Sequence, residues 1–342
     1  MLYISSRSKT DSFTAHRALH NETAPDGGVF VPFHLPVLDA DFMQQLRGQS
    51  FCKTVSDILN LFFSCGISEW DVECSIGRTP VRVLEMSHRL LAAEMWHNPE
   101  GNYQHIEKNI FNKLTGGAGE PTKWAKIAIR VAFLFGIYGS VLDERIESFD
   151  TSVACGDFTQ PMAAWYARKM GLPIGTIICA CNENSGPWDL ICRGELNTGA
   201  STVKTQVPLL DDACPIGLER IVFETLGQDA VKELAEKCAK KSTFRVDAES
   251  LPLLNEGLTS AVVGDSRIGS ILSSVYRTNR YIADHYAAIP YGAIQDYRAR
   301  SGESKLTLFF ADNSPVLQAD KIASLIGLSS KELIAAIHSI KE

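Results

Sequence analysis

The sequence has no long uninterrupted hydrophobic run, no excess of positive charge and no low-complexity segment. No run approaches the ~18 apolar residues of a membrane helix, and the start MLYISSRSKT lacks the apolar core of a signal peptide, so we expect neither feature. A formal net charge of −7 leaves no basic excess to attract phosphate backbones, which disfavours nucleic acid as a partner. We therefore place the chain in the cytoplasm.

Paired cysteine motifs are also missing. The nine cysteines are scattered, odd in number and without CxxC spacing, which argues against a disulfide framework and against a zinc knuckle. The nearest pair, Cys179 and Cys181, falls in the apolar run IICAC, where cysteine usually serves as a small hydrophobic residue.

A second candidate for metal binding is the group His97, Glu100, His105 and Glu107. The two histidines do not share one helical turn, and the nearby Pro99 argues for irregular chain. We interpret these residues as surface polar residues on a loop, and we predict no metal site.

What is present is an ordinary globular composition, with 45% hydrophobic and 21% charged residues. The chain has 342 residues, and single cores seldom grow beyond roughly 250 to 300 residues, so we expect two domains.

The most informative stretch, Thr151–Asn184, reads as strand, glycine-containing loop, helix and strand. This is a βαβ unit, whose loop leaves the carboxyl end of the first strand and presents backbone N–H groups to a ligand. The sequence therefore predicts ligand-facing residues in this loop and after the second strand: Gly156, Asp157, Phe158, Thr159, Gln160, Asn182 and Asn184.

The segments YISSR and APDGGVFVP, separated by a predicted helix, resemble the start of threonine synthases, which read YISTRG and APDGGLYVP. The similarity follows the family order to the end, through YARKMGLPI and LERIVFE. The resemblance implies an α/β fold of the tryptophan-synthase-β type, fold type II, with flanking helices. We expect a small threonine-synthase-like domain over residues 1–80 and a large domain over residues 81–342.

The resemblance also shows departures from the family at its cofactor, pyridoxal phosphate. The family run LELFHGPTLAFKD supplies the lysine that binds the cofactor as an imine. Against LEMSHRLLAAEMW, Leu84, Glu85 and His88 match, and the lysine position holds Met95. A thioether cannot replace the primary amine that this chemistry needs.

The phosphate-binding loop is altered as well. The family loop GNFGD becomes GDFTQ, which introduces the carboxylate of Asp157 and places Thr159 where the family has glycine. A carboxylate ~5 Å from a unit of phosphate charge costs about 3 kcal/mol at an effective dielectric near 20, or about a hundredfold in affinity. Alternatively, Asp157 caps the following helix as a built-in anion, which is the interpretation we favour.

Two further departures affect the cofactor's ring and the substrate side. The last strand, KLTLFFADNSP, resembles the family's LSTAHP, and Phe309 and Phe310 take the positions of the hydroxyl that meets the pyridine nitrogen. The family's smaller subdomain is largely deleted near residues 96–121, where the run TGGAG, residues 115–119, is either a linker or a remnant of the substrate loop. We favour the linker.

Together these changes predict a threonine-synthase-like protein that has lost pyridoxal phosphate and the original lyase reaction. It would be non-catalytic or repurposed to bind a small ligand, with no cofactor expected. A homodimer or a partner protein is expected to cover the apolar surface that the lost subdomain leaves exposed.

The alternative is an enzyme, for example a pyridoxal-phosphate-dependent lyase acting on an amino acid or a phosphorylated amino acid. It would need Lys108 or Lys113 to fold back into the site. A different chemistry would have to use the remaining polar groups: Asp157, His88, Asp284 and His285.

Overall fold

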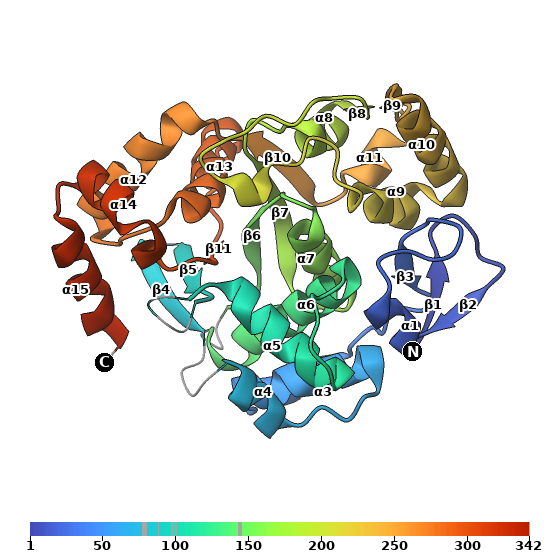
Figure 1. Ribbon diagram of the computed structural model, residues 1–342, viewed down its shortest axis with the longest axis horizontal. Helices are drawn as coiled ribbons and strands as arrows, with labels where there is room; N and C mark the ends of the chain where they lie inside the picture. Colours follow the sequence, from blue (N-terminus) through green and yellow to red (C-terminus); the bar gives the residue numbers. More distant parts are fainter. Residues whose placement is uncertain (77–80, 88, 97–98, 100, 143–145, 342) are drawn as a thin grey trace.

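A mixed sheet of six strands forms the centre of the protein in the computed structural model, which describes residues 1–76, 81–87, 89–96, 99, 101–142 and 146–341 (Figure 1). All neighbouring strands are parallel except the edge strand β4, which pairs antiparallel with β5. In spatial order the strands are β10 (Leu258–Val262), β7 (Ile174–Cys181), β6 (Phe149–Ala154), β11 (Thr307–Ala311), β5 (Leu90–Glu94) and β4 (Arg82–Ser87).

Helices cover both faces of this sheet, which accounts for the nearly continuous apolar sequence of its inner strands. One face packs with α6 (Lys123–Ser140) and α7 (Thr159–Lys169), and the other with α12 (Asp265–Asn279) and α13 (His285–Ser301). The predicted βαβ unit is β6–α7–β7, and the α/β architecture predicted from the sequence is confirmed.

Helix α6 is the buried helix of the core. Its sequence is apolar nearly all round, and most of its side chains, including the charged Arg130, are inaccessible to solvent. The hydroxyl of Thr122 accepts the N–H of Ala125 at 3.2 Å and so begins the helix.

The N-terminal region is a three-stranded antiparallel sheet followed by helices. Asp26 fixes the turn before β3 by accepting the N–H of Gly28 at 3.0 Å and the Ser5 hydroxyl at 2.7 Å, and Gly27 there has a φ of 79°. The elements are β1 (Leu2–Ser5), β2 (Ser12–Thr14), α1 (Ala15–His20), β3 (Phe30–Pro32), α2 (Ala40–Leu46), α3 (Phe51–Phe63) and α4 (Glu69–Ile76).

Helix α9 (Leu218–Leu226) joins this region to the large sheet. Its Glu219 forms a 2.8 Å ion pair with Arg7 and accepts the hydroxyl of Ser6. At the start of α9, a Cβ on Gly217 would collide with the backbone carbonyl of Asp157, so this helix lies directly against the predicted ligand loop.

The segment that replaces the smaller subdomain forms helix α5 (Tyr103–Thr115), so the prediction of loop there was wrong. Asn102 caps α5 by accepting the N–H of His105 at 3.1 Å, and Gly116 ends it in the left-handed region with a φ of 67°. Five hydrophobic side chains of α5 are buried, and they are Tyr103, Ile106, Ile110, Phe111 and Leu114. Glycine-rich residues 116–119 then lead towards α6, as expected of a linker.

The rest of the chain completes the flanks of the sheet. Figure 1 shows the C-terminal helices at one side of the molecule and α9 to α11 at the other. None of the described helices is long and apolar enough to cross a membrane. The remaining elements are α8 (Gly186–Arg193), β8 (Glu195–Asn197), α10 (Gln228–Lys240), β9 (Thr243–Arg245), α11 (Leu251–Leu254), α14 (Ala319–Ile326) and α15 (Ser330–Lys341), with short 3₁₀ turns at Pro208–Leu210 and Pro315–Gln318.

A glycine substitution tests the contact between α6 and the N-terminal helices. A Cβ on Gly139 would lie 2.8 Å from the backbone oxygen of Leu46. Alanine is the better helix former by about 1 kcal/mol, but overpacking costs about 1–3 kcal/mol, so we expect Gly139→Ala to lower the free energy of unfolding. Urea denaturation measures this change.

The control is Gly269→Ala in α12, whose added Cβ would meet only the flexible end of Leu325 at 3.2 Å. It should leave stability unchanged or raise it. A Gly139→Ala protein as stable as the control would contradict the close packing of α6 on α2.

Candidate functional site

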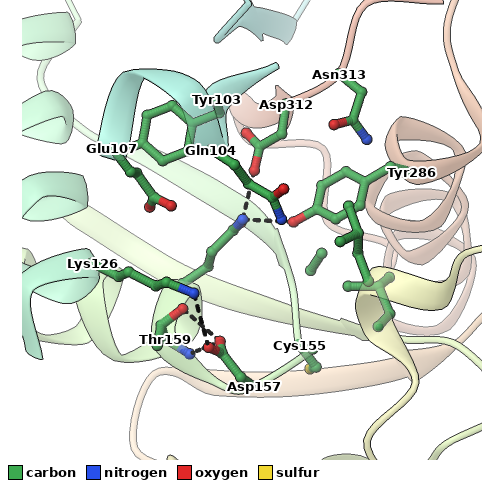
Figure 2. A pocket seen from close by; sticks show the side chains of 15 residues that line it. Tyr103, Gln104, Glu107, Lys126, Cys155, Asp157, Thr159, Tyr286, Asp312 and Asn313 are labelled. Atoms are coloured by element: carbon green, nitrogen blue, oxygen red, sulfur yellow. Dashed lines mark hydrogen bonds and ion pairs between the residues drawn. The ribbon is translucent and has the colours of Figure 1, made fainter. Parts of the chain in front are cut away.

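A cleft of about 220 Å³ opens at the carboxyl ends of β6 and β11 (Figure 2). In the sheet, β6 pairs with β7 on one side and with β11 on the other, and β11 pairs in turn with β5. The strand order therefore changes direction between β6 and β11. α/β proteins bind ligands at such a switch point. Its lining residues are Tyr103, Gln104, Glu107, Lys126, Ala154, Cys155, Gly156, Asp157, Thr159, Gln160, Leu209, Leu210, Tyr286, Asp312 and Asn313.

The glycine loop forms one wall of the cleft, and Asp157 occupies the start of the helix that follows it. Its carboxylate accepts the backbone N–H of Thr159 at 3.1 Å and the Thr159 hydroxyl at 2.6 Å. Phe158 takes the helix-cap position in the left-handed region, with a φ of 65°, and its ring is buried in the core. These contacts agree with the capping interpretation of Asp157.

A buried ion pair stands at the back of the cleft. Arg130 on α6 donates two hydrogen bonds to Asp312, at 2.7 and 3.1 Å. Gln160 on α7 donates from its amide nitrogen to Asp312 and to the hydroxyl of Tyr286, both at 2.6 Å. Burial lowers the pKa of Arg130, but the charge and hydrogen bonds of Asp312, together with Tyr103 and Glu107, outweigh it, so the pKa is raised and the guanidinium stays charged.

Helix α5 supplies the opposite wall through two residues one turn apart, Tyr103 and Glu107. The Tyr103 ring stacks under the guanidinium of Arg130, whose carbon lies 3.7 Å from the ring centre. Within the described chain, the carboxylate of Glu107 has no hydrogen bond or ion pair, and burial raises its pKa to about 8. Figure 2 shows this carboxylate facing the cleft near Lys126.

The amine in the cleft comes from Lys126, which the sequence interpretation missed. Its Nζ lies 4.0 Å from the carboxylate of Asp157. The lysines considered from the sequence lie elsewhere, since Lys108 is paired with Glu120 and Lys113 with Asp71. Among the described residues that line the cleft, Lys126 is the only lysine.

Asn182 and Asn184 do not line the cleft. Asn182 donates to Asp211 at 2.7 Å and to the Thr205 hydroxyl at 2.9 Å, and Asn184 donates to the same carboxylate at 3.2 Å. Both asparagines therefore hold the segment that follows β8 against the end of β7.

That segment covers the glycine loop. Leu209 and Leu210 line the cleft, and a Cβ on Gly156 would lie 3.1 Å from the backbone oxygen of Leu209. Gly156 has a φ of 40°, so a larger residue there would meet both strain and crowding. The two asparagines thus act on the cleft through the covering segment and not by direct contact.

The residues at the family's lysine and hydroxyl positions are core residues. Met95 follows β5, donates its N–H to Ala311 at 2.9 Å, and is 1% exposed. Phe309 and Phe310 alternate along β11, so their rings pack on opposite faces of the sheet. The first side chain beyond the strand, Asp312, reaches the cleft.

Asp284 and His285 do not converge on one site. Asp284 caps α13 by accepting the N–H groups of Tyr286 at 3.2 Å and Ala287 at 2.9 Å, and burial raises its pKa to about 6. Burial lowers the pKa of His285, which is not among the residues that line the cleft. Asp284 contacts the cleft lining through the N–H of Tyr286 and through Asn313, which donates to it at 3.1 Å.

The structure thus brings together Gly156, Asp157, Thr159 and Gln160 of the predicted site. It adds residues from α5, α6, α13 and the end of β11 that the sequence did not indicate. The one available signal was the four-residue spacing of Tyr103 and Glu107, which places both side chains on the same face of a helix. These added side chains are Glu107, Lys126, Tyr286 and Asp312, with Arg130 behind them.

Three residues considered from the sequence, His88, His97 and Glu100, lie outside the described part of the chain. Within that part, no group of three histidine, cysteine or acidic side chains is arranged to hold a metal ion. Glu107, interpreted from sequence as a surface residue on a loop, is instead a buried residue of α5.

Known proteins resemble this chain in sequence and in fold. The family model described as "Threonine synthase N terminus" matches residues 2–79. Threonine synthase of Methylobacillus glycogenes is 31% identical over 171 residues, which are 49% of this chain and 34% of that protein. The structure of pyridoxal-phosphate-bound threonine synthase from Brucella melitensis superimposes with a TM-score of 0.85, at 16% identity, over 98% of this chain and 94% of that one. The chain is therefore similar in sequence to threonine synthases, and it shares their fold.

Two more relatives define the extent of this likeness. The human protein called threonine synthase-like 1 is 24% identical over 220 residues, covering 61% of this chain and 30% of that protein. Yeast threonine synthase shares the fold with a TM-score of 0.82 and 16% identity over 95% of this chain and 90% of that one. The sequence match therefore spans about a third of the curated relatives, while the fold extends over nearly the whole threonine synthase-like chain.

Removing one partner of the buried ion pair tests how far the cleft depends on it. Arg130→Met leaves the carboxylate of Asp312 buried without its cation, and such a loss costs about 3–5 kcal/mol. We expect the free energy of unfolding in urea to fall by that amount. Arg193→Met, which removes an exposed pair with Asp189, should change stability by less than about 1 kcal/mol. Equal effects of the two substitutions would contradict the structural role of Arg130.

The pKa of Glu107 predicts a pH dependence of stability. The folded protein holds this proton up to about pH 8, whereas the unfolded chain releases it near the ordinary value of 4.5. Stability from this group is therefore complete at low pH and is lost as the pH rises towards 8, at about 1 kcal/mol per pH unit.

Glu107→Gln should remove that component, so that stability falls less steeply between pH 5 and 8 than in the unmodified protein. Urea denaturation at several pH values measures the slope. Glu236→Gln, on the exposed face of α10, is the control and should keep the original slope. Parallel slopes for Glu107→Gln and the unmodified protein would show that Glu107 titrates normally.

Proposed function

We propose that this threonine synthase-like chain no longer carries out the pyridoxal-phosphate reaction and uses the cleft to bind a different small molecule. The single observation that carries the proposal is the occupied start of α7, where Asp157 already accepts the N–H and the hydroxyl of Thr159. A bound phosphate would compete with this carboxylate for the same N–H group and would be repelled by its charge.

The two other attachment points support the same proposal. The family's lysine position holds the buried thioether of Met95, which has no nucleophilic nitrogen. The end of β11, where the family places a hydroxyl, contributes Asp312, whose oxygens are engaged by Arg130 and Gln160. The residues present therefore do not fit pyridoxal phosphate, and we derive no catalytic step through it.

A lyase remains the competing candidate because the cleft contains one amine, that of Lys126. This amine lies 4.0 Å from the carboxylate of Asp157, and its side chain is about a third exposed. A partly exposed amine that is paired with a carboxylate favours a binding role over a catalytic one.

Visible absorbance of the protein with and without added pyridoxal phosphate tests the proposal. We expect no imine absorbance, and no lysine modified by the cofactor after borohydride reduction and peptide mass spectrometry. The threonine synthase from Brucella melitensis, whose structure contains pyridoxal phosphate, is the positive control. An imine that forms and is lost in Lys126→Ala would overturn the proposal in favour of the lyase.

The predicted small molecule, the division near residue 80, the homodimer or partner protein and the cytoplasmic location are also proposals. The contacts of Glu219 with Arg7 and Ser6 support a tightly joined pair of regions in place of two freely moving domains. No nucleic acid is proposed as a partner, because the net charge of −7 disfavours it.

A further inference from the structure

The cleft contains three polar groups that the protein does not satisfy. The hydroxyl of Tyr103 and the side-chain oxygen of Gln160 are buried and have no hydrogen-bond partner within the described chain. The carboxylate of Glu107, on a residue that is 8% exposed, likewise has no partner there. Unsatisfied buried polar groups are costly, and the occurrence of two of them beside an unpaired carboxylate in one cleft points to a ligand that satisfies them.

The chemistry of these groups selects the ligand. The Gln160 oxygen and the Glu107 carboxylate accept hydrogen bonds, and the Tyr103 hydroxyl also accepts one. The Gln160 amide is fixed in this orientation, because its nitrogen donates to Asp312 and Tyr286. A primary ammonium supplies three N–H donors on one atom, one for each of these acceptors.

The balance of charges in the cleft also favours a ligand with an ammonium group. Asp312 is neutralised by Arg130, and Asp157 lies 4.0 Å from Lys126, so Glu107 is the acid without a cation of its own. One ligand cation would balance Glu107 once it is ionised. A phosphate or carboxylate ligand would instead add negative charge beside three acidic side chains.

The remaining lining residues suit a ligand with a short hydrocarbon part. Leu209, Leu210 and Ala154 line the cleft together with the aromatic residue Tyr286. The volume of about 220 Å³ limits the ligand to a small molecule. We propose that the cleft binds a small aliphatic amine, with its ammonium group on Glu107, Gln160 and Tyr103 and its hydrocarbon part against the leucines.

This inference rests on the proposed function, because a cleft that held pyridoxal phosphate would have no room for a separate amine. It also gives Glu107 a role in ligand binding that the resemblance to the family does not assign. The groups that face Glu107 are Tyr103 on its own helix, Lys126 and Arg130 on α6, Asp157 before α7, and Asp312 after β11.

Isothermal titration calorimetry with butylammonium tests the inference, with butan-1-ol and butyrate as matched neutral and anionic probes of similar size. We expect saturable binding of butylammonium at least tenfold tighter than that of either analogue. Glu107→Gln should weaken butylammonium binding at least tenfold, and the exposed control Glu236→Gln should not change it. Equal binding of butan-1-ol or butyrate, or unchanged binding by Glu107→Gln, would overturn the inference.

The pH dependence separates a ligand contact from a merely structural role of Glu107. Because the ammonium binds the ionised carboxylate, affinity should rise about tenfold per pH unit between pH 6 and 7 and level off near pH 8. In Glu107→Gln the affinity should not change over this range. Failure of these titrations leaves the absorbance test of pyridoxal phosphate unaffected, so the two proposals fail separately.

Discussion

The ion pair between Arg130 and Asp312 is the interaction on which the rest of the cleft depends. It joins the most deeply buried helix, α6, to the end of the central strand β11. A buried pair of this kind is better tolerated when its charges accept or donate further hydrogen bonds. Gln160 donates one to Asp312, and it also donates to the hydroxyl of Tyr286. The side chains of α6, α7, α13 and β11 therefore reach the cleft in one fixed arrangement.

This arrangement changes what the inherited cleft can recognise. Its place at the switch point of the sheet still favours ligand binding, as in other α/β proteins. However, the Arg130 guanidinium and the N–H of Thr159 are already bound to the protein's own carboxylates. Under the proposed function, such a site favours ligands that bring donors with them.

The sequence was sufficient for the parts of the structure that local patterns encode. The βαβ unit follows from its apolar runs and the glycine-containing loop between them, and it is present as β6–α7–β7. Helix α5 was missed because proline and glycine just before it suggested irregular chain, although its cap at Asn102 was readable. The sequence did not indicate which residue reaches the cleft from β11. Strand alternation directs Phe309 and Phe310 into the two cores, and Asp312, the first residue beyond the strand, lines the cleft.

Helix α9 touches the glycine loop at one end and holds the first residues of the chain through Glu219. The backbone at Gly217 leaves no space between this helix and the carbonyl of Asp157. The N-terminal region therefore supports one wall of the cleft through its contacts with α9. Side chains of the glycine loop can therefore change while the N-terminal segment stays in place, whereas loss of that segment would remove the contacts that hold α9 against this wall of the cleft.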